Sequence, residues 1–304
     1  MTNLTLRQLR YFEALALHRH FGRAADACAI SQPALSLQIK ELEEDLGLPL
    51  FERSSRQIRL TPFGEDMAER ARNVLRGVEE IGEMARMAQS GLVGRLRLGV
   101  IPTIAPYLLP NLLRRLKTDF PDLTLHVRET MTATLIEELR QGRIDTAIVA
   151  LPVSEPTFEE MPLLSENFVL VRPKSEGDTP VPAPENLERE RLLLLEEGHC
   201  FRDQALSFCG MPTARAHEGL DGSSLSTLVQ MVGAGLGVTL IPEMAVPVET
   251  PSAEVTVARF KGVEPNRKIG MIWRKSSPLA PQLQRIGYSV QTSAASSIRF
   301  VTTS

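Results

Sequence analysis

Two cysteines carry the most specific chemistry in this sequence. Cys200 follows Gly198 and His199, precedes Arg202 by two positions, and lies just before the helix-like segment DQALSFC. A thiolate is favoured beside cations and at helix N-termini, so Cys200 is the candidate reactive thiol. A peroxide converts such a thiolate to a sulfenic acid, which a nearby thiol condenses into a disulfide. Another cysteine, Cys209, follows nine positions later.

The spacing of these two cysteines predicts a conformational change. If residues 201–209 are helical, the two Cα atoms are about 13 Å apart along the helix axis. A disulfide tolerates a Cα separation of no more than about 7 Å. Residues 200–209 would then have to unwind or move, as in an allosteric switch. The alternative is that both cysteines are buried thiols that pack as small hydrophobes, the role expected for Cys28.

The elements that must position this segment alternate between strands and helices. After Gly94 we expect a βαβαβ succession, with strands at 95–101, 123–130 and 145–151 and helices at 105–120 and 132–142. This order predicts a parallel, doubly wound sheet. Further strands are expected at 169–173, 192–196, 238–242, 255–260 and 268–274, with helices near 223–233 and 278–291. The pattern therefore indicates an α/β fold with two lobes and a cleft between them.

Residues 62–90 predict one long helix with an apolar stripe. Steps of three and four residues separate Phe63, Met67, Ala71, Val74, Val78, Ile81, Ala85 and Ala88. This spacing is close to that of a coiled-coil seam. We therefore expect the helix to pair with a second copy of the chain; the alternative is that it folds back onto its own C-terminal domain.

Residues 1–50 predict three short helices, two of which form a helix-turn-helix. Ala24 and Ala25 allow close helix crossing, Ser31 is suited to cap the next helix, and Pro33 lies in its first turn. In that helix a polar face carries Gln32, Ser36 and Lys40, opposite Leu35, Ile39 and Leu42. Exposed side chains at such a helix N-terminus reach base edges in the major groove. Arg53, Arg56 and Arg59 then suit phosphate contacts.

These motifs together resemble the winged helix-turn-helix of LysR-type transcriptional regulators. The resemblance rests on AA-x(5)-SQPALS-x-QI-x-x-LE-x-x-LG-x-x-LFER and on LTPFG, and it extends over the whole chain. It implies a DNA-binding domain at 1–60, a dimerising linker helix at 61–91 and a regulatory domain at 92–304 that resembles periplasmic binding proteins. The lobes of that domain would be 92–165 with 269–304, and 166–268. The implied DNA-binding residues are Ser31, Gln32, Pro33, Ser36, Gln38, Lys40, Arg53 and Arg56. Leu37 departs from the Arg of many members.

The cysteine segment at 192–212 resembles the peroxide-sensing OxyR branch of that family, as do residues 101–110 and 223–242. The resemblance implies that Cys200 is the peroxide-reactive thiol and Cys209 the resolving thiol. It implies that Thr103, Thr132, His199 and Asp203 bind the peroxide. Thr130 and Thr134 remain alternatives to Thr132.

The resemblance also implies the partners. We expect double-stranded operator DNA with dyad symmetry, RNA polymerase, a homodimer or dimer of dimers, hydrogen peroxide and a cellular thiol reductant. The chain would switch on oxidative-stress genes and would not be an enzyme; no metal, flavin or nucleotide cofactor is implied. Two alternatives are a LysR-type regulator of a small organic effector, in which Cys200 is incidental, and a thiol peroxidase.

Composition sets the remaining limits. With 43% hydrophobic and 23% charged residues, the chain has the balance of a soluble globular protein. No apolar run approaches the roughly 18 residues that a membrane span needs, and the start MTNLTLRQLR lacks a secretory core, so we expect a cytoplasmic protein. Three scattered cysteines exclude a disulfide scaffold and a structural zinc site. A net charge of −3 indicates nothing about nucleic acid, so the DNA-binding prediction rests on local pattern.

Overall fold

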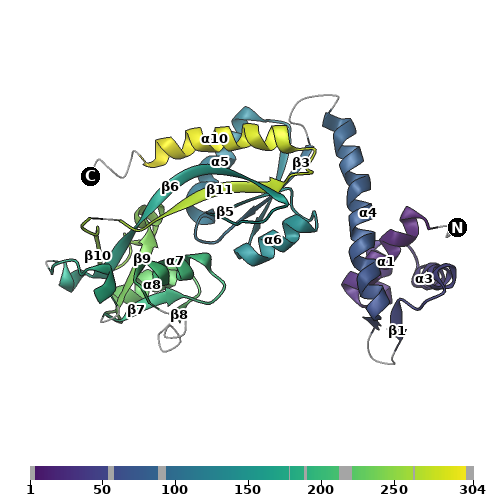
Figure 1. The fold of residues 1–304 in the computed structure, drawn as a ribbon, viewed down its shortest axis with the longest axis horizontal. Coiled ribbons are helices and arrows are strands. Elements are labelled where there is room, and N and C mark those ends of the chain that lie inside the picture. The colour runs from purple at the N-terminus through teal and green to yellow at the C-terminus, as the bar shows by residue number, and fades with distance from the viewer. Residues whose placement is uncertain are drawn as a thin grey trace. The chain divides into compact units, whose positions relative to one another are not determined.

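The chain divides into two units, Met1–Arg86 and Met87–Ser304, which Figure 1 shows as ribbons. The structure is a computed structural model, and it describes residues 4–53, 58–87, 94–177, 179–187, 190–211, 221–262 and 264–298. Among these residues no helix has the length and apolar character needed to cross a membrane.

The N-terminal unit contains the predicted helices and a two-stranded wing. Its elements are α1 (Leu6–His18), α2 (Phe21–Ala27), α3 (Gln32–Leu46), β1 (Phe51–Arg53), β2 (Ile58–Leu60) and α4 (Pro62–Met87). Strands β1 and β2 pair antiparallel. Leu35, Ile39 and Leu42, the apolar face predicted for α3, are fully buried and share one core with Phe12 and Leu15 of α1.

Helix α4 uses its apolar residues in two ways. Met67 and Ala71 of the predicted stripe are buried in the core of their own unit, together with Leu75, which lies off the stripe. Val74 is 48% exposed and Ile81 is 67% exposed. The seam interpretation is therefore wrong for Met67 and Ala71, which are buried in their own unit, whereas Phe63 at the start of α4 is 37% exposed. The side chain of Ala85, and Ala88 altogether, lie outside the described residues.

The C-terminal unit is built on a mixed sheet. Its strands are β3 (Gly94–Val100), β4 (Leu123–Glu129), β5 (Thr146–Leu151), β6 (Phe158–Pro173), β7 (Leu192–Leu195), β8 (Asp221–Gly222), β9 (Val238–Pro242), β10 (Val255–Ala258) and β11 (Asn266–Arg274). The order along the sheet is β4-β3-β5-β11-β6-β9-β7-β8, and β10 pairs with β6. Strand β3 is parallel to β4 and β5, so the predicted parallel βαβαβ unit is confirmed.

Two long strands connect the lobes, as Figure 1 shows. Strand β6 pairs with β11 over residues 158–167, and with β9 and β10 over residues 168–173. The predicted strand at 169–173 is therefore only the end of a longer strand that begins at Phe158. Its first part was missed because Pro162 and several polar residues interrupt the apolar pattern.

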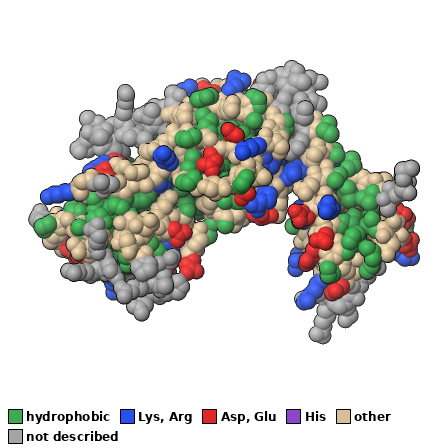
Figure 2. Space-filling view, viewed as in Figure 1, with side chains coloured by type: hydrophobic (Ala, Val, Ile, Leu, Met, Phe, Trp, Pro, Cys, Tyr) green, Lys and Arg blue, Asp and Glu red, His purple; other side chains and the backbone are tan. Residues whose placement is uncertain are grey.

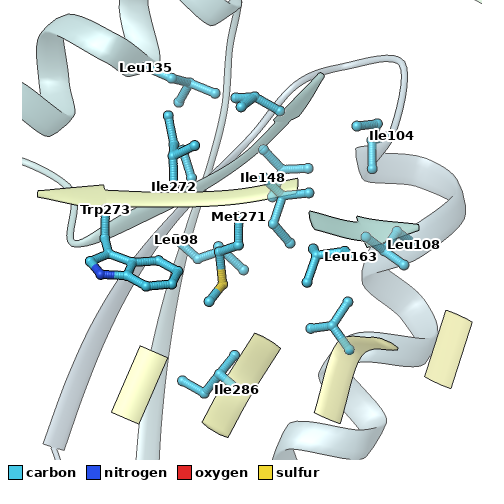
Figure 3. Packing of buried hydrophobic residues seen from close by; sticks show 14 of the residues in the cluster. Leu98, Ile104, Leu108, Leu135, Ile148, Leu163, Met271, Ile272, Trp273 and Ile286 are labelled. Atoms are coloured by element: carbon cyan, nitrogen blue, oxygen red, sulfur yellow. The ribbon is translucent and has the colours of Figure 1, made fainter. Parts of the chain in front are cut away.

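Helices cover both faces of the sheet. They are α5 (Ala105–Asp119), α6 (Thr132–Arg140), α7 (Cys200–Phe208), α8 (Leu225–Gly233), α9 (Val246–Glu249) and α10 (Ala280–Ile298), with short 3-10 turns η1 (Lys174–Glu176), η2 (Pro184–Asn186) and η4 (Glu243–Ala245). In Figure 3, Ile272 points to the side of the sheet where Leu135 of α6 lies, and Met271 to the side of Ile286 in α10. Trp273 of β11 lies in the same core and is 2% exposed.

The buried residues of the C-terminal unit form two separate cores. The first core joins β3, β5 and β11 to helices α5, α6 and α10. The second core joins residues 168–171 of β6, β7 and β9 to helices α7 and α8. Each lobe thus has its own hydrophobic interior, which is the arrangement that leaves a cleft between lobes.

Candidate functional site

Cys200 and Cys209 lie at opposite ends of helix α7. Cys200 is the first residue of the helix, and Cys209 is its C-cap, whose backbone N–H donates to the carbonyl of Ala205. The two side chains are thiols and no disulfide joins them. With the intervening residues helical, their Cα atoms are about 13 Å apart, compared with a limit of about 7 Å for a disulfide. The predicted helix is confirmed, and the two sulfurs are out of bonding reach.

The two cysteines also belong to different cores. The half-buried Cys200 packs against the first core. Cys209 is 3% exposed and belongs to the second core. Helix α7 therefore spans from one hydrophobic interior to the other, and joining its ends would change the packing of both.

A close backbone approach fixes the start of α7. Gly198 has a φ of +93°, which L residues with a side chain rarely adopt. A Cβ at this position would come within 2.7 Å of the sulfur of Met131, the N-cap of α6. Only glycine lets the loop before Cys200 lie against the start of α6 in this way.

His199 is held in its neutral form at the N-cap of α7. It is 6% exposed. Burial lowers the pKa of His199 below the ordinary value, and Glu196 only partly opposes this. At neutral pH the imidazole can therefore both accept and donate a hydrogen bond.

A cleft of about 360 Å³ brings part of the predicted peroxide site together. Thr103 and His199 both line it, together with Thr130 and Met131. Thr132 and Asp203 do not line this cleft, although Thr132 directly follows Met131. Asp203 is exposed in the first turn of α7, where the positive end of the helix dipole stabilises a negative charge.

Two buried polar atoms near the N-terminal parts of α6 and α7 make no hydrogen bond within the described residues. They are the hydroxyl oxygen of Thr132 and the amide oxygen of Gln204. Buried polar atoms normally have a partner, so these two are suited to a small polar ligand. Thr134, one of the alternatives to Thr132, is exposed. Gln204 was missed because only its burial sets it apart from other glutamines.

Arg267 is a site residue that the sequence did not indicate. It lies on β11 and is 3% exposed. Its guanidinium donates to the hydroxyl oxygen of Thr103 at 2.8 Å and to the Thr103 carbonyl at 3.0 Å. The same group lies 5.3 Å from the ring centre of Phe201, the neighbour of Cys200. Since a guanidinium only donates, the Thr103 hydroxyl is left to donate its own proton elsewhere.

Arg202 does not direct its charge toward the cleft. It is 3% exposed, and its guanidinium donates to the carbonyl of Leu195 and, at 2.9 Å, to Asp221. Arg202 therefore anchors α7 to β7 and β8. Within the described ranges no group of three or more His, Cys, Asp or Glu is placed to hold a metal ion.

The candidate DNA-reading residues lie on α3. Ser31 caps the helix, its hydroxyl accepting from the backbone N–H of Ala34 at 3.4 Å. Gln32, Pro33 and Lys40 are exposed, and Ser36 and Gln38 are partly buried. Lys40 is 3.3 Å from Glu44, and Leu37 is 56% exposed. Arg53 is the last residue of β1, but its side chain is not among the described parts of the chain. Arg56 lies outside the described residues.

Comparison with known proteins identifies relatives over nearly the whole chain. Residues 6–65 match the family described as bacterial regulatory helix-turn-helix protein, lysR family, and residues 89–291 match the LysR substrate binding domain. A probable hydrogen peroxide-inducible genes activator of Streptomyces viridosporus is 44% identical over 294 residues, covering 94% of this chain and 93% of that protein. The DNA-binding transcriptional dual regulator OxyR of Escherichia coli is 40% identical over 292 residues, with 95% of each chain covered.

Two solved structures have the same architecture. A full-length OxyR variant from Pseudomonas aeruginosa has a TM-score of 0.76 at 36% identity, covering 96% of each chain. A hydrogen peroxide-bound OxyR variant from Corynebacterium glutamicum has a TM-score of 0.68 at 36% identity, covering 98% of this chain and 94% of the other.

Proposed function

This chain belongs to the LysR family of transcriptional regulators, and from that premise we propose that it senses hydrogen peroxide through Cys200 and Cys209 and switches on oxidative-stress genes. It is a regulator of the OxyR type and not an enzyme. The proposal places it in the cytoplasm, where it meets its operator DNA.

The proposed chemistry has two steps. The Cys200 thiolate attacks one oxygen of hydrogen peroxide: an S–O bond forms, the O–O bond breaks, and hydroxide leaves and is protonated to water. The Cys209 sulfur then attacks the Cys200 sulfenic acid: an S–S bond forms and a second water leaves. A cellular thiol reductant returns both cysteines to thiols by exchange.

The observation that carries the proposal is the position of the two cysteines at opposite ends of α7. A disulfide between them requires the helix to unwind, and both cores must repack because each holds one of the cysteines. Oxidation would thereby convert a local bond into a change of the whole regulatory domain. Such a covalently controlled two-state element is what a redox switch requires.

Polar groups of the cleft, which includes His199 next to Cys200 but not Cys200 itself, and the buried oxygens on α6 and α7 support the binding of a small peroxide. We propose that Thr103 donates its hydroxyl proton to one peroxide oxygen while Arg267 occupies the acceptor side of that hydroxyl. Thr132 and Gln204 would form hydrogen bonds to the peroxide through their side-chain oxygens. Asp203 and the neutral imidazole of His199 would orient the peroxide or protonate the leaving oxygen.

Mass spectrometry of the peroxide-treated full-length chain tests this chemistry. The expected product is a peptide pair linked through Cys200 and Cys209. Cys209→Ser should stop at a sulfenic acid that dimedone traps, and Cys200→Ser should abolish both products. Cys28→Ser, at a half-buried cysteine of the N-terminal unit, is the matched control. Persistent thiols after treatment, or an unchanged product in Cys200→Ser, would contradict the proposal.

For DNA we propose that α3 enters the major groove of an operator with dyad symmetry. In this proposal Ser31, Gln32, Pro33, Ser36, Gln38 and Lys40 face the bases or adjacent backbone, and Arg53 and Arg56 contact phosphates. Residues 1–60 would bind DNA, 61–91 would pair two copies and 92–304 would sense peroxide. Oxidation would rearrange the dimer or tetramer and its contact with RNA polymerase. Footprints of reduced and oxidised protein should therefore differ, and identical footprints would refute the switch.

The cleft also favours a second candidate function. Beside Thr103 and His199 it is lined by Tyr107, Ser226 and Glu249, and the Tyr107 hydroxyl donates to Glu249 at 2.7 Å. A polar cleft of about 360 Å³ has room for a small organic effector. In that case Cys200→Ser would leave the transcriptional response intact, whereas redox sensing predicts its loss.

A further inference from the structure

A second hollow lies outside the redox site. It measures about 480 Å³ and lies between α5, residues 164–167 of β6, and the segment formed by η4 and α9. Its apolar walls are Pro106, Leu108, Leu164, Met244, Pro247 and Val248. It shares only Pro106 and Tyr107 with the cleft described above. This volume is within the range of about 300–1,000 Å³ that is typical of small-molecule sites.

Glu166 gives this groove a specific chemistry. Its side chain lines the groove and is 3% exposed. One carboxylate oxygen, Oε1, accepts from Nε of Arg267 at 2.7 Å and lies 2.6 Å from Nη2. The other oxygen, Oε2, is buried and makes no hydrogen bond within the described residues. The Met244 amide also favours the charged form, but it forms no bond of normal geometry to Oε2.

An unmatched carboxylate oxygen in a buried position is unfavourable. Moving a carboxylate oxygen out of water without a new hydrogen bond costs more free energy than an ordinary hydrogen bond contributes. Buried carboxylate oxygens therefore normally accept a hydrogen bond. Burial raises the pKa of Glu166, while Arg267 acts in the opposite direction. A ligand that brings one N–H or O–H group to Oε2 would replace the lost water, and its apolar part would cover the surrounding walls.

We propose that this groove binds a small molecule with a compact apolar body and one hydrogen-bond donor, and that the donor bonds Oε2 of Glu166. The charge of Glu166 is already balanced by Arg267. The Glu243 carboxylate, also in the lining, is paired with Arg259. The ligand therefore needs a donor but not a positive charge, and a neutral hydroxyl fits better than an ammonium group.

Three probes of one size separate these features. Benzyl alcohol carries a neutral donor, benzylamine carries an ammonium group, and toluene carries no donor. Saturation-transfer NMR titrations of the reduced full-length protein should show benzyl alcohol binding at least tenfold more tightly than toluene. Benzylamine should bind no more tightly than benzyl alcohol. Titrating the Cys200→Ser variant as well makes the result independent of peroxide chemistry.

Two variants locate the site. Val248 is 57% exposed at the groove, so Val248→Trp should fill the groove and abolish binding of all three probes. Glu166→Met, which has no oxygen to accept a hydrogen bond from the ligand and no N–H to donate one, should remove the preference for benzyl alcohol over toluene. Val257→Trp is the matched control, since Val257 is 37% exposed on β10 and does not line the groove.

Three results would overturn the proposal. Equal affinities for toluene and benzyl alcohol would exclude the donor to Glu166. Unchanged binding in Val248→Trp would place the probes elsewhere. Affinity that falls as the protein concentration rises would show that a second copy of the chain covers the groove.

Discussion

Gly198 controls how closely the reactive end of α7 approaches α6. We predict that Gly198→Ala is destabilising by about 1–2 kcal/mol from its φ of +93° alone. In addition, its Cβ would displace Met131, which approaches within 2.7 Å. Because Cys200 follows two residues later, the variant should also react with peroxide several-fold more slowly. Urea unfolding and thiol-loss kinetics measure the two effects.

Gly210 supplies the matched control at the other end of α7. It has a φ of +63°, but nothing lies within 4 Å of an added Cβ. Gly210→Ala should therefore cost stability without slowing the reaction of Cys200. In the double variant Gly198→Ala with Met131→Ala, the peroxide rate should partly recover. If Gly198→Ala and Gly210→Ala slow the reaction of Cys200 with peroxide equally, the contact with Met131 does not affect that reaction.

His199 should make the stability of the regulatory domain depend on pH. Burial lowers the pKa of His199 in the folded chain, so the unfolded chain takes up a proton first as the pH falls below about 6.5. The contribution is present in full above that pH and is lost in more acidic solution. We predict that His199→Gln flattens the increase in unfolding free energy between pH 5 and 7.

The measurement is urea unfolding at a series of pH values. His126→Gln, which replaces an exposed imidazole on β4, is the control for the loss of a histidine. A slope in His199→Gln equal to that of the unaltered chain would show that His199 does not titrate differently on folding.

At the scale of elements, α7 is held by an ion pair that oxidation should break. The buried Arg202 on α7 donates to Asp221, whose side chain is 33% exposed, at 2.9 Å. This pair stabilises the reduced form if α7 unwinds on oxidation. We predict that Asp221→Asn shifts the thiol–disulfide equilibrium two- to fivefold toward the disulfide, which corresponds to about 0.5–1 kcal/mol for a partly exposed pair.

Redox titration in glutathione buffers, read by thiol alkylation, measures this shift. Glu254→Gln is the control, because it removes a similar ion pair with Lys174 in which both side chains are exposed. An oxidation midpoint for Asp221→Asn that matches the control would mean that the Arg202 contact survives in the disulfide form.

Local pattern predicted most elements of this fold. The strand at 238–242 is observed at the predicted residues because all five of its side chains are buried, which gives a continuous apolar run. The first part of β6 was not predicted, because Glu159, Glu160 and Pro162 resemble a loop until β11 pairs with them. In α4 the heptad spacing drew attention to the predicted stripe, and Leu75 was not predicted because it lies off that stripe. Leu75 is buried in the N-terminal core.

Some residues of the candidate site could likewise be predicted from the sequence, and others could not. The neighbours of Cys200 indicated a reactive thiol, and the family resemblance indicated Cys209, Thr103 and His199. Thr103 and His199 do meet in one cleft. Arg267 was not recognisable, because 164 residues separate it from Thr103. Nothing near Arg267 in sequence indicates that its strand β11 passes beside the start of α5. Long-range partners of buried charges depend on topology, which local pattern does not contain.

For the whole molecule, charge alone does not explain DNA binding. The net charge is −3, and Figure 2 shows basic and acidic side chains interspersed over the face it presents. A single copy of the chain therefore has no net charge that would attract it to phosphate from a distance. Tight operator binding then needs two copies joined so that both reading helices engage together, which raises the effective concentration of the second. We propose that the exposed part of the α4 stripe is the surface through which two copies pair.

We predict that Ile81→Asp separates the dimer. Val74 and Ile81 are seven residues, or one heptad, apart on α4 and are 48% and 67% exposed, as expected for successive heptads of an uncovered seam. A carboxylate there would be buried without a partner in the paired helices, so dimer affinity should fall at least tenfold in sedimentation experiments. Asn73→Asp adds the same charge at an exposed position off the stripe and should leave the dimer intact. If the two variants sediment alike, α4 does not pair through this stripe; if only Ile81→Asp becomes monomeric and loses operator binding, recognition of a dyad depends on it.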